Sequence, residues 1–122
     1  MKTAVIIVGH GSRSAGADET VKRVATEVKK IGSCEIVEYA FLQHVSPAPH
    51  DALEHCIRQQ AKKIVIVPFF MQPGAHVMND IPEFVEKAKK QHPDLEIRMT
   101  EFVGSHPLMT EIVLDLVRKD DC

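Results

Sequence analysis

The stretch that decides the fold is Thr3–Val8, which reads Thr-Ala-Val-Ile-Ile-Val and is followed by Gly9. A continuous run of mostly β-branched residues is typical of a parallel strand that is buried on both faces of a sheet. A second run of this kind, Lys-Ile-Val-Ile-Val-Pro, occupies Lys63–Pro68. Two further segments, 35–41 and 95–100, have strand-like composition. The sequence therefore predicts four strands.

Helical periodicity separates these strands. Apolar residues recur at helical spacing between residues 14 and 31, and Gly32 follows them. Further helices are predicted over 48–60, from a capping box at Asp80–Glu83 to residue 91 with Pro82 in the first turn, and over the last stretch of the chain. The apolar stripes of these four helices are Val21, Val24, Ala25, Val28 and Ile31; Ala52, Leu53, Cys56 and Ile57; Phe84, Val85 and Ala88; and Met109, Ile112, Val113, Leu116 and Val117.

The strict alternation of strands and helices predicts the α/β class. Short connections imply right-handed crossovers and a parallel sheet with the strand order 2-1-3-4, covered by helices on both faces. The length of 122 residues fits one domain, residues 1–122, without an internal repeat or linker. Such a layer is half of a larger doubly wound fold, and a partner subunit would supply the other half.

Composition excludes several classes of function. The net charge of −2, the absence of Trp and an aromatic content of 5% argue against a nucleic-acid partner. Three cysteines without a Cys-x-x-Cys pair indicate reduced thiols rather than a disulfide framework or a structural zinc site. The apolar runs are too short for a signal peptide or a membrane span. We therefore expect a soluble protein of the cytoplasm with no membrane partner.

Two histidines follow the two most apolar strands. His10 lies between glycines directly after the first strand, and His76 follows a loop with the turn signal Pro73-Gly74 after the third. In the order 2-1-3-4 the chain reverses direction between these strands, and ligands of open α/β sheets bind at that switch point. Because imidazole binds borderline divalent metals and accepts protons near neutral pH, the pair predicts metal handling coupled to proton removal.

The chain resembles the small, single-domain members of the class II chelatase family, the sirohydrochlorin chelatases. These enzymes insert cobalt, nickel or iron into a reduced tetrapyrrole. The resemblance implies a homodimer of chelatase-like domains, each one half of a bilobal chelatase, in which His10 and His76 bind the metal and accept the pyrrole protons. The segments that carry it are Val8–Arg13, Ala40–Pro47, Ile64–Phe70, Gly74–Val77, Asp80–Pro82 and Gly104–Pro107.

The same resemblance implies a lyase with no organic cofactor, for which the divalent metal, Co²⁺ first, is a substrate. The tetrapyrrole carries several carboxylates, and the helix N-terminus expected after Gly11 would receive one of them together with Ser12 and Arg13. The residues expected to bind the tetrapyrrole are Gly11, Ser12, Arg13, Gln43, His44, Gly74 and Ala75.

One departure from the family pattern concerns Gln43 and Ser46, which stand where members of the family commonly have carboxylates. Glutamine cannot take a proton, although its oxygen can be a neutral ligand. His44 is an alternative base. A protein that binds metal or tetrapyrrole without turnover is therefore a second hypothesis. A third is phosphoryl transfer through His10, although Gly9 stands where histidine phosphatases have arginine.

The other histidines are assigned to structure rather than chemistry. His50 and His55 are five apart on a helix and cannot hold one ion together, so we expect both at the surface. His106 precedes the last helix and is expected to cap it or to be solvated. Met71 and Met78 flank the loop after the third strand, where they would form an apolar lip or fill the core.

Overall fold

Strands and helices alternate along the described part of the chain. The computed structural model describes residues 2–14, 16, 18–32, 34–72 and 74–120, and residues 75–78 by their backbone only. The elements in order are β1 (Thr3–Gly9), α1 (Glu19–Ile31), β2 (Ile36–Phe41), α2 (Pro49–Arg58), β3 (Lys63–Pro68), α3 (Ala75–Gln91), β4 (Glu96–Met99), the 3₁₀ turn η1 (Val103–Ser105) and α4 (Leu108–Lys119).

The four strands form one parallel sheet in the order β2-β1-β3-β4, as predicted. Strand β1 is central, and its register pairs Ala4 with Ile36 of β2 and with Ile64 of β3. The predicted bounds of β3 are confirmed, and β1 runs from Thr3 to Gly9, so it contains the whole predicted apolar run Thr3–Val8. Because all strands run the same way, their carboxyl ends share one edge of the sheet.

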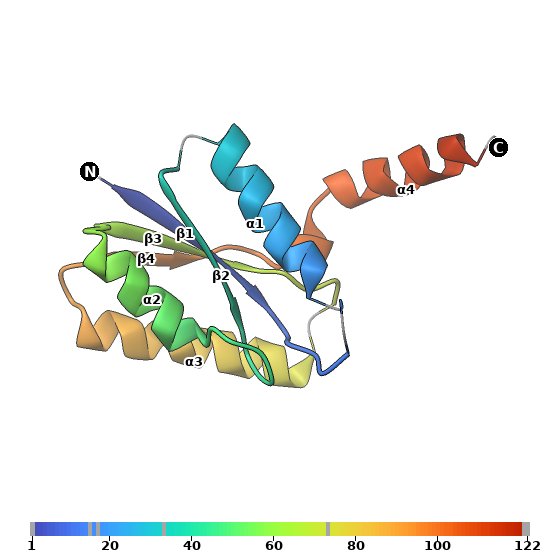
Figure 1. The fold of residues 1–122 in the computed structure, drawn as a ribbon. Coiled ribbons are helices and arrows are strands. Elements are labelled where there is room, and N and C mark those ends of the chain that lie inside the picture. Colours follow the sequence, from blue (N-terminus) through green and yellow to red (C-terminus); the bar gives the residue numbers. More distant parts are fainter. Residues whose placement is uncertain (1, 15, 17, 33, 73, 121–122) are drawn as a thin grey trace.

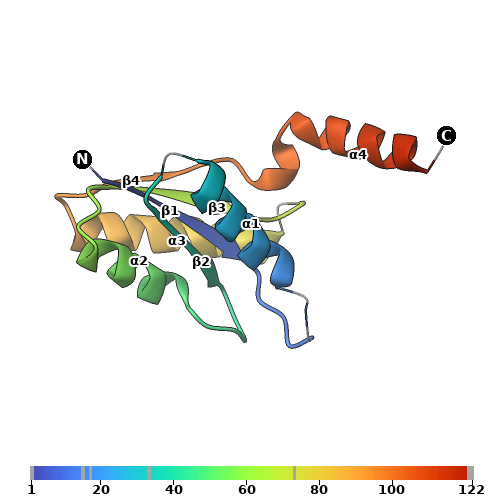
Figure 2. The same cartoon turned by 45° about the horizontal axis from the view of Figure 1, so that its top comes forward.

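Helices cover the two faces of the sheet unequally (Figures 1 and 2). Helices α2 and α3 pack on one face, where the side chains of Ile6, Ile64 and Ile66 are fully buried. On the other face, Val21 and Ala25 of α1 pack over β1 and β2. The predicted stripes of α2 and α3 are confirmed: Ala52, Leu53, Cys56, Val85 and Ala88 are buried, and Ile57 and Phe84 are half-buried against the same core.

Two helix starts differ from the prediction. Helix α1 begins at Glu19 rather than near residue 14. Helix α3 begins at Ala75, after Gly74 in an extended conformation, so Pro82 lies inside the helix and not in its first turn. Burial of Ile81 and Val85 on either side of the proline holds this helix together across the hydrogen bond that Pro82 cannot donate.

The prediction that the last helix covers the sheet is wrong. Helix α4 points away from the body of the structure (Figure 1), and within the described part of the chain every residue of α4 except Met109 is exposed. At the end of α1, Ile31 is 82% exposed, so the predicted stripe of that helix ends at Val28. Among the described residues, no helix is long and apolar enough to cross a membrane.

The core contains one thiol with altered acidity. Burial, with a smaller contribution from the charge of Glu38, raises the pKa of Cys56 from 9.0 to about 12. The folded state therefore favours the protonated thiol, and this contribution to stability is full below pH 9.0 and is lost as the pH rises toward 12. Cys34 is half-exposed and serves as an internal reference.

We expect the unfolding temperature of the wild type to fall more between pH 8 and pH 10 than that of Cys56→Ala, because only the wild type gains a thiolate on unfolding. Thermal unfolding at the two pH values measures this difference. Iodoacetamide should label Cys34 much faster than Cys56 in the folded protein, as judged by peptide mass spectrometry. Equal labelling rates would contradict the burial of this thiol.

Candidate functional site

The pairing of β1 and β2 continues beyond the ends of both strands. Leu42 donates its backbone N–H to the Gly9 carbonyl at 3.1 Å, and Gln43 donates to the His10 carbonyl at 3.2 Å. These hydrogen bonds extend the parallel ladder into the two loops at the carboxyl edge of the sheet. As a result, two predicted site residues that are 33 positions apart in the chain lie side by side.

Gly11 makes this close approach possible. Its φ angle is +93°, in the region that favours glycine, and a Cβ atom there would lie 1.8 Å from the Gln43 carbonyl oxygen. The loop after β2 therefore packs directly on the backbone of Gly11. Gly11 therefore allows the two loops to pack closely, and it does so because it has no side chain.

We expect Gly11→Ala to lower the free energy of unfolding by about 3 kcal/mol or more, because the added methyl overlaps backbone and the residue is strained. Gly16 is the matched control, since it also has a positive φ of +80° but a Cβ atom there meets nothing within 4 Å. Gly16→Ala should cost only about 1–2 kcal/mol. Urea denaturation measures both values, and equal losses would contradict the packing of Gln43 on Gly11.

The side chains of His10 and Gln43 meet at the edge of the sheet. The Gln43 amide nitrogen lies 2.7 Å from His10 Nε2, and both side chains are exposed. Because an amide nitrogen can only donate, Nε2 accepts this hydrogen bond, and the ring proton is on Nδ1. The nitrogen with a free lone pair for a metal or a proton is therefore occupied by Gln43 in this arrangement.

Phe70 supports the His10 ring from the β3 side. The two ring centroids are 6.3 Å apart with an interplanar angle of 86°, an edge-to-face contact. The Phe69 N–H donates to the Val8 carbonyl at 2.8 Å and so extends the β1–β3 ladder toward Phe70. Phe70 was not among the site residues predicted from the sequence. The β1–β3 register, in which Val8 pairs with Pro68, places it opposite His10.

The predicted tetrapyrrole-binding residues Arg13 and His44 also come together. Arg13 donates from Nε to His44 Nδ1 at 3.2 Å, and both side chains are exposed. His44 has a φ of +64°, so its backbone turns sharply after Gln43. This bond leaves the terminal guanidinium nitrogens of Arg13 and the Nε2–H of His44 as hydrogen-bond donors at the surface.

The predicted helix N-terminus after Gly11 is wrong. Since α1 begins at Glu19, Ser12 lies in a loop, and its backbone N–H is bonded to Asp18 Oδ2 at 3.2 Å. Ser12 Oγ accepts a hydrogen bond from the Ser14 N–H at 3.1 Å. The Ser12 hydroxyl proton can still be donated to a ligand, but the backbone of this loop already has an internal partner.

His76 lies in the first turn of α3, which follows the carboxyl end of β3, so its backbone is at the same edge as His10. The side chains of Ala75, His76 and Met78 and the residue Pro73 lie outside the described part of the structure. The prediction that His10 and His76 face one cavity therefore stays a prediction. Gly74 is exposed, and its extended backbone precedes the first turn of the helix.

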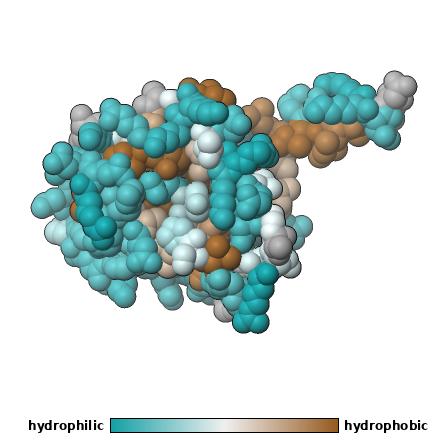
Figure 3. All heavy atoms as spheres, viewed as in Figure 1, coloured by the Kyte–Doolittle hydropathy of each residue, from teal (hydrophilic) through white to brown (hydrophobic). Residues whose placement is uncertain are grey.

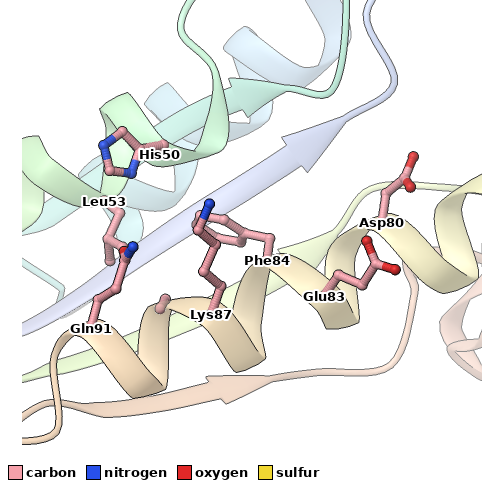
Figure 4. Close-up of a pocket in the computed structure, with 8 residues that line it drawn as sticks. His50, Leu53, Asp80, Glu83, Phe84, Lys87 and Gln91 are labelled. Atoms are coloured by element: carbon pink, nitrogen blue, oxygen red, sulfur yellow. The ribbon is translucent and has the colours of Figure 1, made fainter.

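The remaining histidines behave as predicted. His50 and His55 are exposed, and His106 Nδ1 accepts the Leu108 N–H at 3.1 Å at the start of α4. His50 lines a groove of about 390 Å³ between α2 and α3 together with Leu53, Phe84 and the charged Glu83 and Lys87 (Figure 4). Met71 is 61% exposed and is not core filling.

Within the described residues, no group of three or more His, Cys, Asp or Glu side chains is placed to hold a metal ion. The groove of Figure 4 contains none of the predicted site residues. The constellation that the structure does assemble at the switch point is His10, Gln43, Phe70, Arg13 and His44, drawn from the loops after β1, β2 and β3.

The parallel sheet in the order β2-β1-β3-β4 places the chain in the open α/β class, whose members bind ligands at the carboxyl edge of the sheet where His10 is exposed. A family model described as CbiX matches residues 4–120, and the chain belongs to this family of class II chelatases. The match confirms the resemblance noted in the sequence, and it separates the chain from the histidine phosphatases.

The curated relatives are named either sirohydrochlorin cobaltochelatase or sirohydrochlorin ferrochelatase. The chain is 30% identical over 136 residues to the sirohydrochlorin cobaltochelatase of Methanopyrus kandleri, with 95% of each chain covered. It is 32% identical to the chloroplastic sirohydrochlorin ferrochelatase of Arabidopsis thaliana, covering 93% of this chain and 51% of that one. A sirohydrochlorin ferrochelatase of Priestia megaterium is 34% identical, with 95% and 44% covered. The chain thus spans about half the length of the last two relatives.

Solved structures confirm the fold. The sirohydrochlorin chelatase SirB from Bacillus subtilis subspecies spizizenii, in complex with cobalt, superposes with a TM-score of 0.86 at 28% identity, covering 98% of this chain and 51% of that chain. A CbiX protein of Marinobacter aquaeolei VT8 gives a TM-score of 0.82 at 24% identity, covering 97% and 96%. The second comparison concerns the fold alone.

Proposed function

We propose that this chain is a sirohydrochlorin chelatase, a lyase-class enzyme that inserts a divalent metal into sirohydrochlorin or a related reduced tetrapyrrole. The metal ion replaces two pyrrole protons, which leave to the site or to solvent. The observation that carries the proposal is the match to a sirohydrochlorin cobaltochelatase over 95% of both chains. Co²⁺ is our first choice of metal, and the relatives named for iron make Fe²⁺ the second.

His10 is proposed as a metal ligand and proton acceptor. Its exposure at the switch point leaves room for a flat macrocycle, and the edge-to-face contact with Phe70 favours one orientation of the ring. Rotation of the Gln43 amide by half a turn would replace its nitrogen with the Oε1 atom beside His10 Nε2. Neighbouring ligands of one ion lie about 3 Å apart when each metal bond is about 2.1 Å, so Nε2 and Oε1 would then fit one ion.

An open ligand set suits a metal that must leave the protein. A nitrogen and a neutral amide oxygen, with His76 as the proposed third ligand from α3, leave coordination positions for the pyrrole nitrogens. Four strong ligands would instead retain the ion. Proton removal is assigned to whichever of His10 and His76 is not bound to metal at that step, because a neutral imidazole takes a proton near neutral pH.

The surface donors beside His10 are proposed to bind the carboxylates of the tetrapyrrole. Arg13 can form paired hydrogen bonds with a carboxylate, and its bond to His44 restricts where the guanidinium lies. The Ser12 hydroxyl, with the backbone of Gly11, Gly74 and Ala75, completes the proposed carboxylate-binding edge. This local set of donors explains how a chain with a net charge of −2 binds an anionic substrate.

We propose that the active form is a homodimer in the cytoplasm, in which each copy is one α/β domain. Relatives about twice as long as this chain support the dimer, since two copies would match their length.

The test is anaerobic mixing of the purified protein with sirohydrochlorin and Co²⁺, followed by the absorbance change of metal insertion. The rate should exceed the spontaneous rate and saturate with tetrapyrrole. A panel with Ni²⁺ and Fe²⁺ identifies the preferred metal. Rates equal to the spontaneous reaction with all three metals would contradict the enzyme.

A second candidate, favoured by the Gln43–His10 hydrogen bond, is a protein that binds the metal or tetrapyrrole without turnover. Gln43 occupies the lone pair of His10 and brings no negative charge. Stoichiometric binding of sirohydrochlorin without acceleration of metal insertion would identify this function.

A further inference from the structure

Two contacts between side chains join the loops that follow β1 and β2. The Gln43 amide lies 2.7 Å from His10 Nε2, and a little further along the chain Arg13 donates from Nε to His44 Nδ1 at 3.2 Å. Both loops end at the lower edge of the molecule in the view of Figure 1, where much of the surface is hydrophilic (Figure 3). The first contact belongs to the proposed metal site, and the second holds a cation beside it.

The backbone at His44 forms a strained turn. The Val45 N–H donates to the Gln43 carbonyl at 2.7 Å, which closes a γ-turn around His44. The φ angle of His44 is +64°, and a γ-turn with a positive φ at its centre is the rare, strained form. Glycine adopts such a conformation without a steric penalty, whereas a residue with a side chain does not. The turn is therefore less stable with histidine at its centre than it would be with glycine.

The packing of the His44 side chain does not offset this strain. The side chain is exposed and lies outside the core clusters of the described residues, whereas the neighbouring Val45 packs against the core on the α1 face. Its contact in the described part of the chain is the hydrogen bond from Arg13. Strained backbone conformations are concentrated at functional sites. The contact with Arg13 is therefore the feature that a histidine at this position provides.

Arg13 is held in a way that leaves it able to bind an anion. The backbone on both sides of it is fixed, because the Ser12 N–H bonds to Asp18 Oδ2 at 3.2 Å and the Ser14 N–H bonds to Ser12 Oγ at 3.1 Å. The ion pairs among the described residues do not include Arg13, and its side chain is exposed. A guanidinium held through Nε still presents its terminal nitrogens to a carboxylate. Restricting the side chain before binding lowers the entropy lost on binding.

We propose that His44 is a positioning residue, which orients Arg13 to bind a carboxylate of the tetrapyrrole and does not itself contact the substrate. The inference rests on the proposed function and adds how the cationic side of that site is held in place. The strained turn puts the acceptor Nδ1 where the Nε–H of Arg13 can reach it. With glycine at this position the loop would fold at least as well, but the Arg13 side chain would be free to rotate.

Two substitutions at His44 separate positioning from direct contact with the substrate. His44→Gly removes the ring and relaxes the turn. His44→Asn keeps an acceptor at the same distance from the backbone, because asparagine Oδ1 and histidine Nδ1 are both bonded to Cγ. Asparagine also adopts a positive φ more readily than most residues. The variant lacks only the Nε2–H donor, through which the ring would contact a substrate directly.

The test is a titration of the metal-free protein with metal-free sirohydrochlorin, followed by absorbance. His44→Gly should raise the dissociation constant by about tenfold, which corresponds to a loss of about 1.4 kcal/mol. His44→Asn should restore the dissociation constant to within about threefold of the wild-type value. In an Arg13→Ala background, His44→Gly should cause no further loss, because His44 acts only through Arg13.

Two results of this titration would overturn the proposal. Equal binding by the wild type and His44→Gly would show that the contact with Arg13 does not matter for the substrate. Binding by His44→Asn as weak as that of His44→Gly would assign the effect to direct contact through Nε2–H.

Gln60→Gly is the matched control for relaxing the backbone. Gln60 is exposed, has a positive φ of +69° and lies between α2 and β3, at the opposite edge of the sheet from the two loops. This variant should leave the dissociation constant for sirohydrochlorin unchanged. In urea, Gln60→Gly and His44→Gly should both unfold at a midpoint no lower than that of the wild type. A much lower midpoint for His44→Gly would mean that the ring stabilises the fold, which contradicts the positioning role.

A measurement without ligand tests the contact itself. In a proton–nitrogen correlation spectrum, the Arg13 Nε–H should exchange slowly with water in the wild type and in His44→Asn, and rapidly in His44→Gly. Rapid exchange in the wild type would refute the positioning of Arg13 while leaving the proposed enzymatic activity intact. A wild type with slow exchange that binds no sirohydrochlorin would instead refute the proposed function, and the role of His44 toward this substrate would fall with it.

Discussion

His10→Ala is expected to lower the protein-dependent rate of cobalt insertion into sirohydrochlorin by about 100-fold or more. The variant loses a metal ligand and a proton acceptor at the same time, and a positioned general base alone contributes about 100-fold or more to a rate. His10 is exposed and contacts Phe70 and the Gln43 side chain rather than the buried core, so the fold should be preserved. Initial rates over a range of Co²⁺ concentrations measure the effect.

His55→Ala is the matched control. His55 is exposed and pairs with Glu38 at 3.5 Å, away from the residues proposed to bind substrate. Its rates should equal those of the wild type, and both variants should unfold at nearly the wild-type temperature. A His10→Ala protein that is folded and fully active would remove His10 from the mechanism, although the family assignment would stand.

The sheet could be predicted because the residues that end its strands can be recognised in the sequence. Runs of β-branched residues stop at Gly9 and Pro68, and the alternation with helices favoured the parallel strand order that the structure has. The positions of His10 and His76 at one edge follow from that order. Local patterns were sufficient here because burial on both faces of a central strand requires an uninterrupted apolar run.

The residues at which α1 and α3 begin depend on tertiary contacts, and local sequence patterns do not reveal these contacts. The N–H of Ser12 bonds to Asp18, and this contact organises a loop where the sequence suggested the first turns of α1. In α3, the preference of proline for the first turn favoured a start near Pro82, but burial of Ile81 and Val85 outweighed the lost hydrogen bond. In each case tertiary contacts decided between local alternatives.

The residues that contact His10 could not be predicted from the sequence, and the reason is different. Phe70 and the Gln43 amide reach His10 through the registers of β1 with its two partners, and apolar runs without alternation do not specify a register. The segment before α4 contains another such contact, since Gly104 packs closely on the backbone of Met71, 33 positions earlier in the chain. The sequence predicted the apolar stripe of this helix but not where it points.

Gln43 is the residue at which this chain departs from the family pattern, and Gln43→Glu reverses that departure. A carboxylate beside His10 Nε2 accepts hydrogen bonds and carries charge, whereas the present amide donates. A negative ligand stabilises a bound divalent ion more than a neutral one does. A difference of about 1.4 kcal/mol corresponds to a tenfold change in affinity.

We expect Gln43→Glu to lower the dissociation constant for Co²⁺ by about tenfold or more, and to lower the Co²⁺ concentration at half-maximal rate in parallel. The maximal rate should not rise, because a more tightly held ion is transferred to the tetrapyrrole less readily. Isothermal titration with Co²⁺ and initial rates measure the two effects. Gln91→Glu, at the far end of α3, makes the same chemical change on an exposed residue and should alter neither.

The outcome distinguishes the two proposed functions. If the wild type binds sirohydrochlorin without turnover and Gln43→Glu gains activity, the glutamine is what makes this chain a binding protein. If the wild type is active and the variant binds Co²⁺ more tightly, the amide is a neutral ligand that tunes metal release. Unchanged Co²⁺ affinity in Gln43→Glu would mean that the ion does not approach His10 Nε2, and the proposed metal position at the β1–β2 edge would have to be abandoned.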